Sequence, residues 1–164
     1  MKSIIGIFHF LVQWTWGILQ NIAGLAVFLV YIRKRHYIFR RCFVTEWDSP
    51  DSSMGLGMFI FIGKNDATNE DVLAHEYGHT VQSALLGPLY LPVIGLPSLV
   101  WANFKPLMKL RRTKNISYYR FYPERWANRI ALKRIGRAPG VRSNHNLEPE
   151  KITRKKFKKL FHIS

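Results

Sequence analysis

Cysteine is almost missing from this chain, since Cys42 is the only one among 164 residues. A single thiol excludes an internal disulfide and a zinc site built from several cysteines, and it is compatible with a reducing compartment. No neighbouring residue indicates an activated thiolate, so we expect Cys42 to be structural.

Acidic side chains are also scarce: the chain has ten Asp and Glu against 25 Lys and Arg, which gives a formal net charge of +15. Residues 1–100 contain equal numbers of acids and bases, so the whole excess lies in residues 101–164. A basic half beside a neutral, apolar half predicts an anionic partner, either phospholipid or nucleic acid.

Charge of either sign is absent from residues 3–32. This stretch exceeds the roughly 20 residues that cross a bilayer, and the cations of residues 33–35 follow it directly. A cleaved signal peptide would be shorter and would end in small residues. The sequence therefore predicts a membrane anchor over residues 1–35. His9, Gln13, Gln20 and Asn21 mark either the buried face of one long helix or, with a break near Gln20 and Asn21, a helical hairpin.

Lysine and arginine flank the uncharged stretch of residues 3–32 unequally, with Lys2 before it and five cations in residues 33–41 after it. The positive-inside rule then predicts a membrane protein whose remaining chain lies in the cytoplasm. We expect a minimal metal-binding domain over residues 36–148 and a basic amphipathic tail over residues 149–164. Such a tail suits an anionic membrane surface, although a solvated terminal helix is the alternative.

The pattern predicts an α+β fold that is mainly helical. Residues 36–47 and 54–63 are typical of strands, and we expect them to form a short antiparallel pair. A capping-box pattern at residues 68–71 opens a helix that should run from about residue 69 to residue 86. A later helix should begin near Pro123 and end near Gly136.

Residues 84–102 are again uncharged, but three prolines interrupt them. Prolines at this density disfavour a regular spanning helix. We expect a re-entrant or interface-lying segment that contacts the membrane; a buried loop of the domain core is the alternative.

The motif with the clearest chemistry is residues 75–79, where His75, Glu76 and His79 form a His-Glu-x-x-His pattern inside the predicted helix. Residues four apart lie about 40° apart around a helix. Both imidazoles can therefore reach one zinc ion, and Glu76 can take a proton from the water that the ion polarises.

A catalytic zinc generally takes three protein ligands. Glu124, at the start of the later helix, is the best candidate because the other acids beyond it lie in or beside the tail. An ion pair with a neighbouring arginine is its alternative role. His36 and His145 are the other possible third ligands.

His75, Glu76 and His79, with Glu124 and Asn128 downstream, resemble the gluzincins, the thermolysin-like metallopeptidases. That resemblance implies a zincin-like helix, a second helix bearing the third ligand, and a side chain at Asn128 that orients a ligand histidine. The wider run over residues 75–98 also resembles small bacterial membrane proteins, with a likeness that covers residues 54–135.

A peptidase also needs a donor for the oxyanion of its intermediate. The candidates near Glu124 are Tyr118, Tyr119, Arg120 and Tyr122. The edge of the strand at residues 54–62 is the expected place for an extended substrate to pair.

These features predict a membrane-associated, zinc-dependent metallopeptidase whose partners are an anionic lipid bilayer and a peptide or protein substrate. A non-catalytic membrane protein with a structural or vestigial metal site is the alternative. We do not expect nucleic-acid binding, because no such motif accompanies the basic half.

Overall fold

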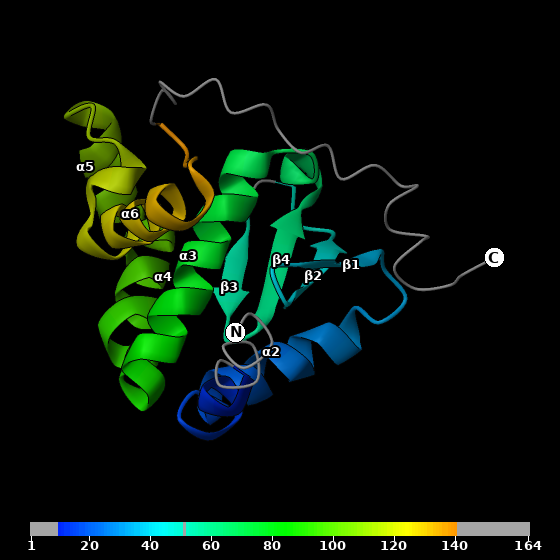
Figure 1. The fold of residues 1–164 in the computed structure, drawn as a ribbon. Coiled ribbons are helices and arrows are strands. Elements are labelled where there is room, and N and C mark those ends of the chain that lie inside the picture. Colours follow the sequence, from blue (N-terminus) through cyan, green and yellow to red (C-terminus); the bar gives the residue numbers. More distant parts are fainter. Residues whose placement is uncertain (1–9, 51, 141–164) are drawn as a thin grey trace.

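Helix α3 (Glu70–Leu86) lies at the centre of the fold, between a small sheet and helix α6 (Tyr122–Ile135) (Figure 1). This computed structural model describes residues 10–50 and 52–140. The sheet has four strands in the order β1-β2-β4-β3. Their bounds are β1 His36–Phe39, β2 Cys42–Trp47, β3 Met54–Leu56 and β4 Phe59–Gly63. The predicted α+β, mainly helical class is confirmed.

The predicted antiparallel pairing of residues 36–47 with residues 54–63 is wrong. Each segment is itself a hairpin, β1 with β2 and β3 with β4, and the neighbouring strands β2 and β4 run parallel. The chain reverses at Arg40 and Arg41, which adopt left-handed φ values of 45° and 70°, and at Gly57, with φ 60°. Two-residue hairpin turns require this region, and a pair of arginines gives no sequence signal for such a turn.

Helix α3 begins where the sequence predicts, because the Asn69 side chain accepts hydrogen bonds from the backbone N–H groups of Asp71 and Val72. It ends at Gly87, whose φ is 52°. One side of α3 packs on the sheet through Leu73, against a buried cluster that includes Cys42 and Ile60. Burial raises the pKa of the Cys42 thiol to about 11, which fits the structural role predicted for it.

The other side of α3 packs on α6 at very short range. A Cβ atom placed on Gly78 would lie 2.3 Å from the carbonyl oxygen of Ala127. Ala74, Ala127 and Ala131 are fully buried along the same contact. Small side chains therefore allow the two helix backbones to approach, and this closeness lets side chains of α3 reach those of α6. Helix α6 ends at Gly136 in the left-handed conformation, as predicted.

The described part of the uncharged N-terminal segment contains a break, at a different place from the one that the hairpin alternative gave it. Residues 10–15 are helical, a turn falls at Trp16 and Gly17, and helix α2 (Ile18–Val30) follows. Of the two alternatives for Gln20 and Asn21, a break at these residues is wrong, since both side chains lie inside α2 and are fully buried. Phe28 of α2 contacts Phe59 of the sheet. No helix in the described part of the chain combines the length and apolar character needed to cross a membrane.

Residues 87–113 form a run of short helical pieces. A 3₁₀ turn (Gly87–Leu89) and a π-helical turn (Leu91–Gly95) lead into α4 (Leu96–Asn103) and α5 (Lys105–Thr113). Each piece has its proline within the first two positions, where a missing N–H costs no helical hydrogen bond. A further 3₁₀ turn (Tyr118–Arg120) precedes α6. The predicted basic tail at residues 149–164 lies outside the described residues.

The close contact of α3 with α6 gives a direct test of packing. Gly78→Ala should lower the free energy of unfolding by about 1–3 kcal/mol, because its methyl group collides with backbone rather than a movable side chain. A drop in Tm of about 2–10 °C is the expected readout. Gly95→Ala is the matched control, since its added Cβ would have its nearest neighbour 3.5 Å away, in the Leu91 side chain. Equal melting of both variants would contradict this account.

Candidate metal centre

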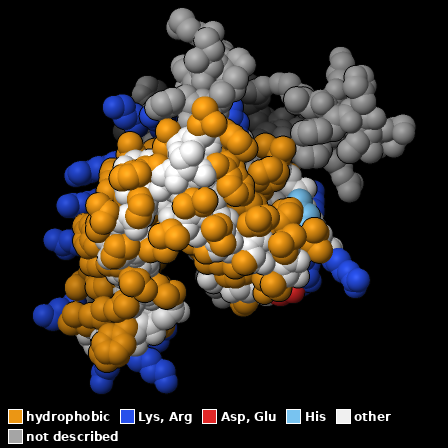
Figure 2. Space-filling view, turned by 90° about the horizontal axis from the view of Figure 1, so that it is seen from below, with side chains coloured by type: hydrophobic (Ala, Val, Ile, Leu, Met, Phe, Trp, Pro, Cys, Tyr) orange, Lys and Arg blue, Asp and Glu red, His pale blue; other side chains and the backbone are white. Residues whose placement is uncertain are grey.

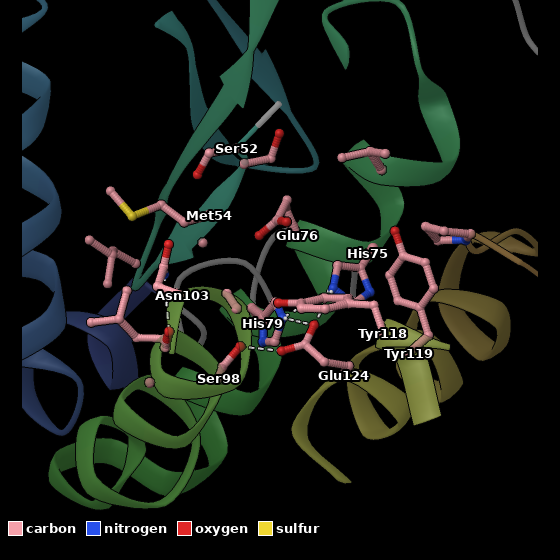
Figure 3. Close-up of a pocket in the computed structure, with 18 of the residues that line it drawn as sticks. Ser52, Met54, His75, Glu76, His79, Ser98, Asn103, Tyr118, Tyr119 and Glu124 are labelled. Carbon is pink, nitrogen blue, oxygen red and sulfur yellow. Dashed lines mark hydrogen bonds and ion pairs between the residues drawn. The ribbon is translucent and has the colours of Figure 1, made fainter. Parts of the chain in front are cut away.

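Three predicted ligands converge between α3 and α6. His75 and His79 lie one helical turn apart on α3, and Glu124 lies in the first turn of α6. His75 Nε2 is 2.9 Å and His79 Nε2 is 3.4 Å from the same oxygen, Glu124 Oε2. All three side chains are buried, and their ligand atoms lie within 4.8 Å of one another (Figure 3).

Two amide side chains orient the imidazoles. His75 Nδ1 lies 2.6 Å from Asn128 Oδ1, and His79 Nδ1 lies 2.8 Å from Gln82 Oε1. Each amide nitrogen donates elsewhere, from Asn128 to the Pro139 carbonyl and from Gln82 to the Pro123 carbonyl. The amide oxygens must therefore face the histidines, so Nδ1 carries the proton in each ring. Nε2 is then the ligand atom on both rings.

The arrangement around Nε2 fits a cation. The two Nε2 atoms are only 3.2 Å apart and both face the Glu124 carboxylate. Two protons cannot occupy the line between these nitrogens, whereas one cation can accept a lone pair from each nitrogen and from the carboxylate. Burial alone would raise the pKa of Glu124, but its interactions with His75 and His79 hold this pKa well below its usual range. The carboxylate is therefore ionised, as a metal ligand must be.

Glu76 lies next to these ligands and opens into the same cavity (Figure 3). Burial raises the pKa of its carboxyl to about 7, and a hydrogen bond from the Gly55 N–H partly opposes the rise. Its Oε2 has no hydrogen-bond partner among the residues that the structure describes. A buried carboxylate oxygen without a partner is costly unless water or a ligand satisfies it. Glu76 is thus placed to bind a water molecule in the cavity.

The cavity has a volume of about 830 Å³ and is lined by the sheet edge, α3, α4 and the start of α6. Of the predicted oxyanion donors, Tyr118 and Tyr119 line it, and burial raises the pKa of Tyr119 to about 12. The Tyr119 ring lies 5.2 Å from the His75 ring. Both hydroxyls therefore remain protonated and can donate at neutral pH.

Three other candidates lie away from the cavity. Arg120 is exposed on another part of the surface, and the Tyr122 hydroxyl donates to the Val93 carbonyl. His36, on β1, places its two ring nitrogens against Thr45 and the Ile32 carbonyl, so it is not the third ligand. His145 lies outside the described residues.

Strand β3 forms the sheet edge beside the cavity, with Gly55 packed against α3. A Cβ atom on Gly55 would lie 2.7 Å from the Glu76 carbonyl oxygen. The Gly55 N–H donates to the Glu76 carboxylate, and its carbonyl accepts from the Tyr90 hydroxyl at 2.9 Å. The edge expected to pair with a substrate therefore already uses its Gly55 hydrogen-bonding groups on the protein itself.

Sequence reasoning missed three contributors to this site. Gln82 was detectable, because it lies one turn beyond His79 on the same helix face. Ser98 of α4 donates a hydrogen bond to Glu124, and Arg111 of α5 lines the cavity between the rings of Trp101 and Tyr118. Neither had a signal in the sequence, since their proximity depends on how the short helices fold back.

Comparison of the chain with protein-family models, curated proteins and solved structures found no match in any of the three. The buried His75, His79 and Glu124 group, which can hold a metal ion, therefore rests on its own geometry.

The two orienting amides predict a measurable effect on metal affinity. Asn128→Ala and Gln82→Ala should each weaken zinc binding about 10–100-fold, because the imidazole loses the acceptor that fixes its tautomer. Competition with a chromophoric chelator measures this. Asn128→Asp should bind at least as tightly as the wild type, since a carboxylate accepts the same N–H.

Asn103→Ala is the matched control, because this amide also lines the cavity but bonds the Leu99 carbonyl rather than an imidazole. Unchanged affinity in both Asn128→Ala and Gln82→Ala would show that the amides do not orient ligands.

Proposed function

We propose that this protein is a membrane-associated, zinc-dependent metallopeptidase of gluzincin type. The observation that carries the proposal is the convergence of His75, His79 and Glu124 beside a cavity that Glu76 also lines. One carboxylate oxygen of Glu76 has no hydrogen-bond partner among the described residues. Two imidazoles and one carboxylate form a donor set that zinc takes in hydrolases, with a position left for water. When bound, zinc supplies Lewis-acid chemistry that polarises an oxygen atom of water or of a carbonyl group.

Proton transfer is assigned to a residue of the chain itself. Glu76 Oε2 accepts a proton from a water molecule in the cavity, while the Gly55 N–H holds the other side of the carboxylate in place. A raised pKa makes Glu76 a stronger base than an exposed carboxylate, which suits proton transfer near neutral pH. Once protonated, the same group can pass the proton to the leaving amine.

Tyr118 and Tyr119 are the proposed donors to the developing oxyanion, because their side chains line the cavity that contains the ligands. Ser98 and the Tyr118 hydroxyl both interact with Glu124. Ser98 therefore positions the third ligand. Tyr118 has a single hydroxyl proton, which it donates either to Glu124 or to the oxyanion.

The alternative is a structural metal site that ties α3 to α6. The full burial of Glu124 and the location of the cluster at the helix contact favour this role. The partnerless oxygen of Glu76 and the large cavity favour catalysis, since a purely structural zinc is usually closed by four protein ligands. Removing the metal lowers Tm in both cases, but only the hydrolase loses turnover.

Glu76→Gln separates the two roles. The zinc-loaded variant should keep one metal per chain but cut a quenched-fluorescent peptide mixture at least about 100-fold more slowly, because the general base is gone. Glu70→Gln is the matched control: it lies on the same helix, is exposed and pairs with Arg137. Wild-type rates in Glu76→Gln would exclude the mechanism. A wild-type protein that binds zinc and cuts none of the mixture would favour the structural alternative.

A further inference from the structure

The helices of the N-terminal segment bury polar side chains and expose apolar ones, which is the reverse of helices in a water-soluble domain. Gln13, Gln20 and Asn21 are completely buried, whereas Leu19 is 51 % exposed and Val30 is 78 % exposed. The side-chain amides of Gln13 and Gln20 form hydrogen bonds despite their burial. The Gln13 side chain donates to the Thr80 carbonyl, and the Gln20 side chain donates to the Gly87 carbonyl at 2.8 Å. The segment is therefore attached to α3 by hydrogen bonds and directs its apolar side chains outward.

A second set of outward apolar side chains comes from the end of α3 through α4. The two sets adjoin, because Trp16 packs against Gly87 and Gln20 bonds it. We call them together the apolar face. Its members are Phe10, Leu11, Trp16, Ile18, Leu19, Ile22, Leu29, Val30, Ile32, Leu85, Leu89, Val93, Leu96, Leu99, Val100 and Phe104. Figure 2 shows hydrophobic side chains over most of this side of the molecule, with Lys and Arg around its margins and an acidic side chain at one edge.

Cations outnumber acids around the apolar face, beside which Asp48 and Glu46 pair with Lys34 and Arg35. No acid occurs between Glu76 and Glu124 in the sequence, and none occurs before Glu46. Helix α5 adds Lys105, Lys109 and Arg112, which are exposed and form no ion pair with any described residue. A broad apolar surface with a mainly cationic margin complements hydrocarbon bordered by anionic head groups.

The metal cavity reaches this face. Leu96 and Leu99 are 58 % and 59 % exposed and also line the cavity, while Ser98 between them donates to Glu124. Helix α4 thus presents leucines to the surface and a serine to the metal ligands. The cavity and the apolar face share one rim.

From this continuity we infer that the apolar face inserts into the surface of an anionic phospholipid bilayer. We also infer that the cavity binds apolar or amphipathic peptide segments that lie on the same bilayer. The docking stands on the surface alone; the choice of substrate rests on the proposed peptidase activity. Residues 85–104 contact lipid directly, so attachment does not depend on the N-terminal segment alone.

Flotation of the full-length protein with phosphatidylcholine vesicles containing or lacking phosphatidylglycerol tests the docking. Leu89→Gln/Val100→Gln/Phe104→Gln should weaken partitioning about tenfold or more, because three apolar side chains no longer enter the bilayer. Ile38→Gln is the matched control, since Ile38 is an exposed apolar residue on β1 that does not belong to the apolar face as defined. Lys105→Gln/Lys109→Gln should weaken binding about fivefold for each charge, and only to vesicles with phosphatidylglycerol.

Wild-type flotation of the triple variant would overturn the inference, since the N-terminal segment would then suffice. An equal loss in Ile38→Gln would overturn it as well. A wild type that self-associates through this face and dissociates in the triple variant, with flotation unchanged, would assign the face to a second copy of the chain.

Turnover tests the substrate class separately. The triple variant should lose activity on a vesicle-bound amphipathic peptide but keep wild-type activity on a short soluble peptide. Equal loss on both would overturn the substrate inference. Flotation as expected with no turnover by the wild type on either peptide would refute the peptidase, and with it the substrate class, while leaving the docking supported.

Discussion

The organisation of this protein depends on the contact of two helix backbones at Gly78 and Ala127. Because no side chain separates them there, His75 and His79 of α3 reach Glu124 and Asn128 of α6. The sheet and α4 hold the two helices in this arrangement. The sheet supports α3 from the opposite side, and α4 folds back so that Ser98 meets Glu124 from the cavity.

Hydrogen bonds around the site fix the orientation of both imidazole rings without a bound metal. Each imidazole faces an amide oxygen on one nitrogen and the shared carboxylate on the other. Each amide is in turn held by a backbone carbonyl. Such a chain of bonds reduces the cost of ordering ligands when a cation binds, because their rotamers and tautomers are already set. Glu76 differs from these residues in keeping one oxygen without a described partner, and this difference separates the ligands from the proposed base.

The sequence was sufficient for features determined by short-range patterns. The start of helix α3 to within one residue, the Gly136 end of α6, and the His75, Glu76 and His79 constellation follow from spacing and capping rules. Glu124 and Asn128 followed from scarcity of acids and a resemblance. The strand pairing was not predictable, because the Arg40 and Arg41 turn lacks the usual glycine or asparagine. Ser98 and Arg111 were missed because proline-bounded helical pieces can fold back in several directions, and tertiary packing selects one.

The proposed chemistry requires that one cation be bound by two residues of α3 and one of α6. The most direct measurement is zinc stoichiometry of the purified full-length protein beside His75→Ala, His79→Ala and Glu124→Ala, with circular dichroism confirming that each is folded. We expect about one zinc per chain in the wild type and less than about a tenth of that in each variant. Equal zinc in all four proteins would contradict it.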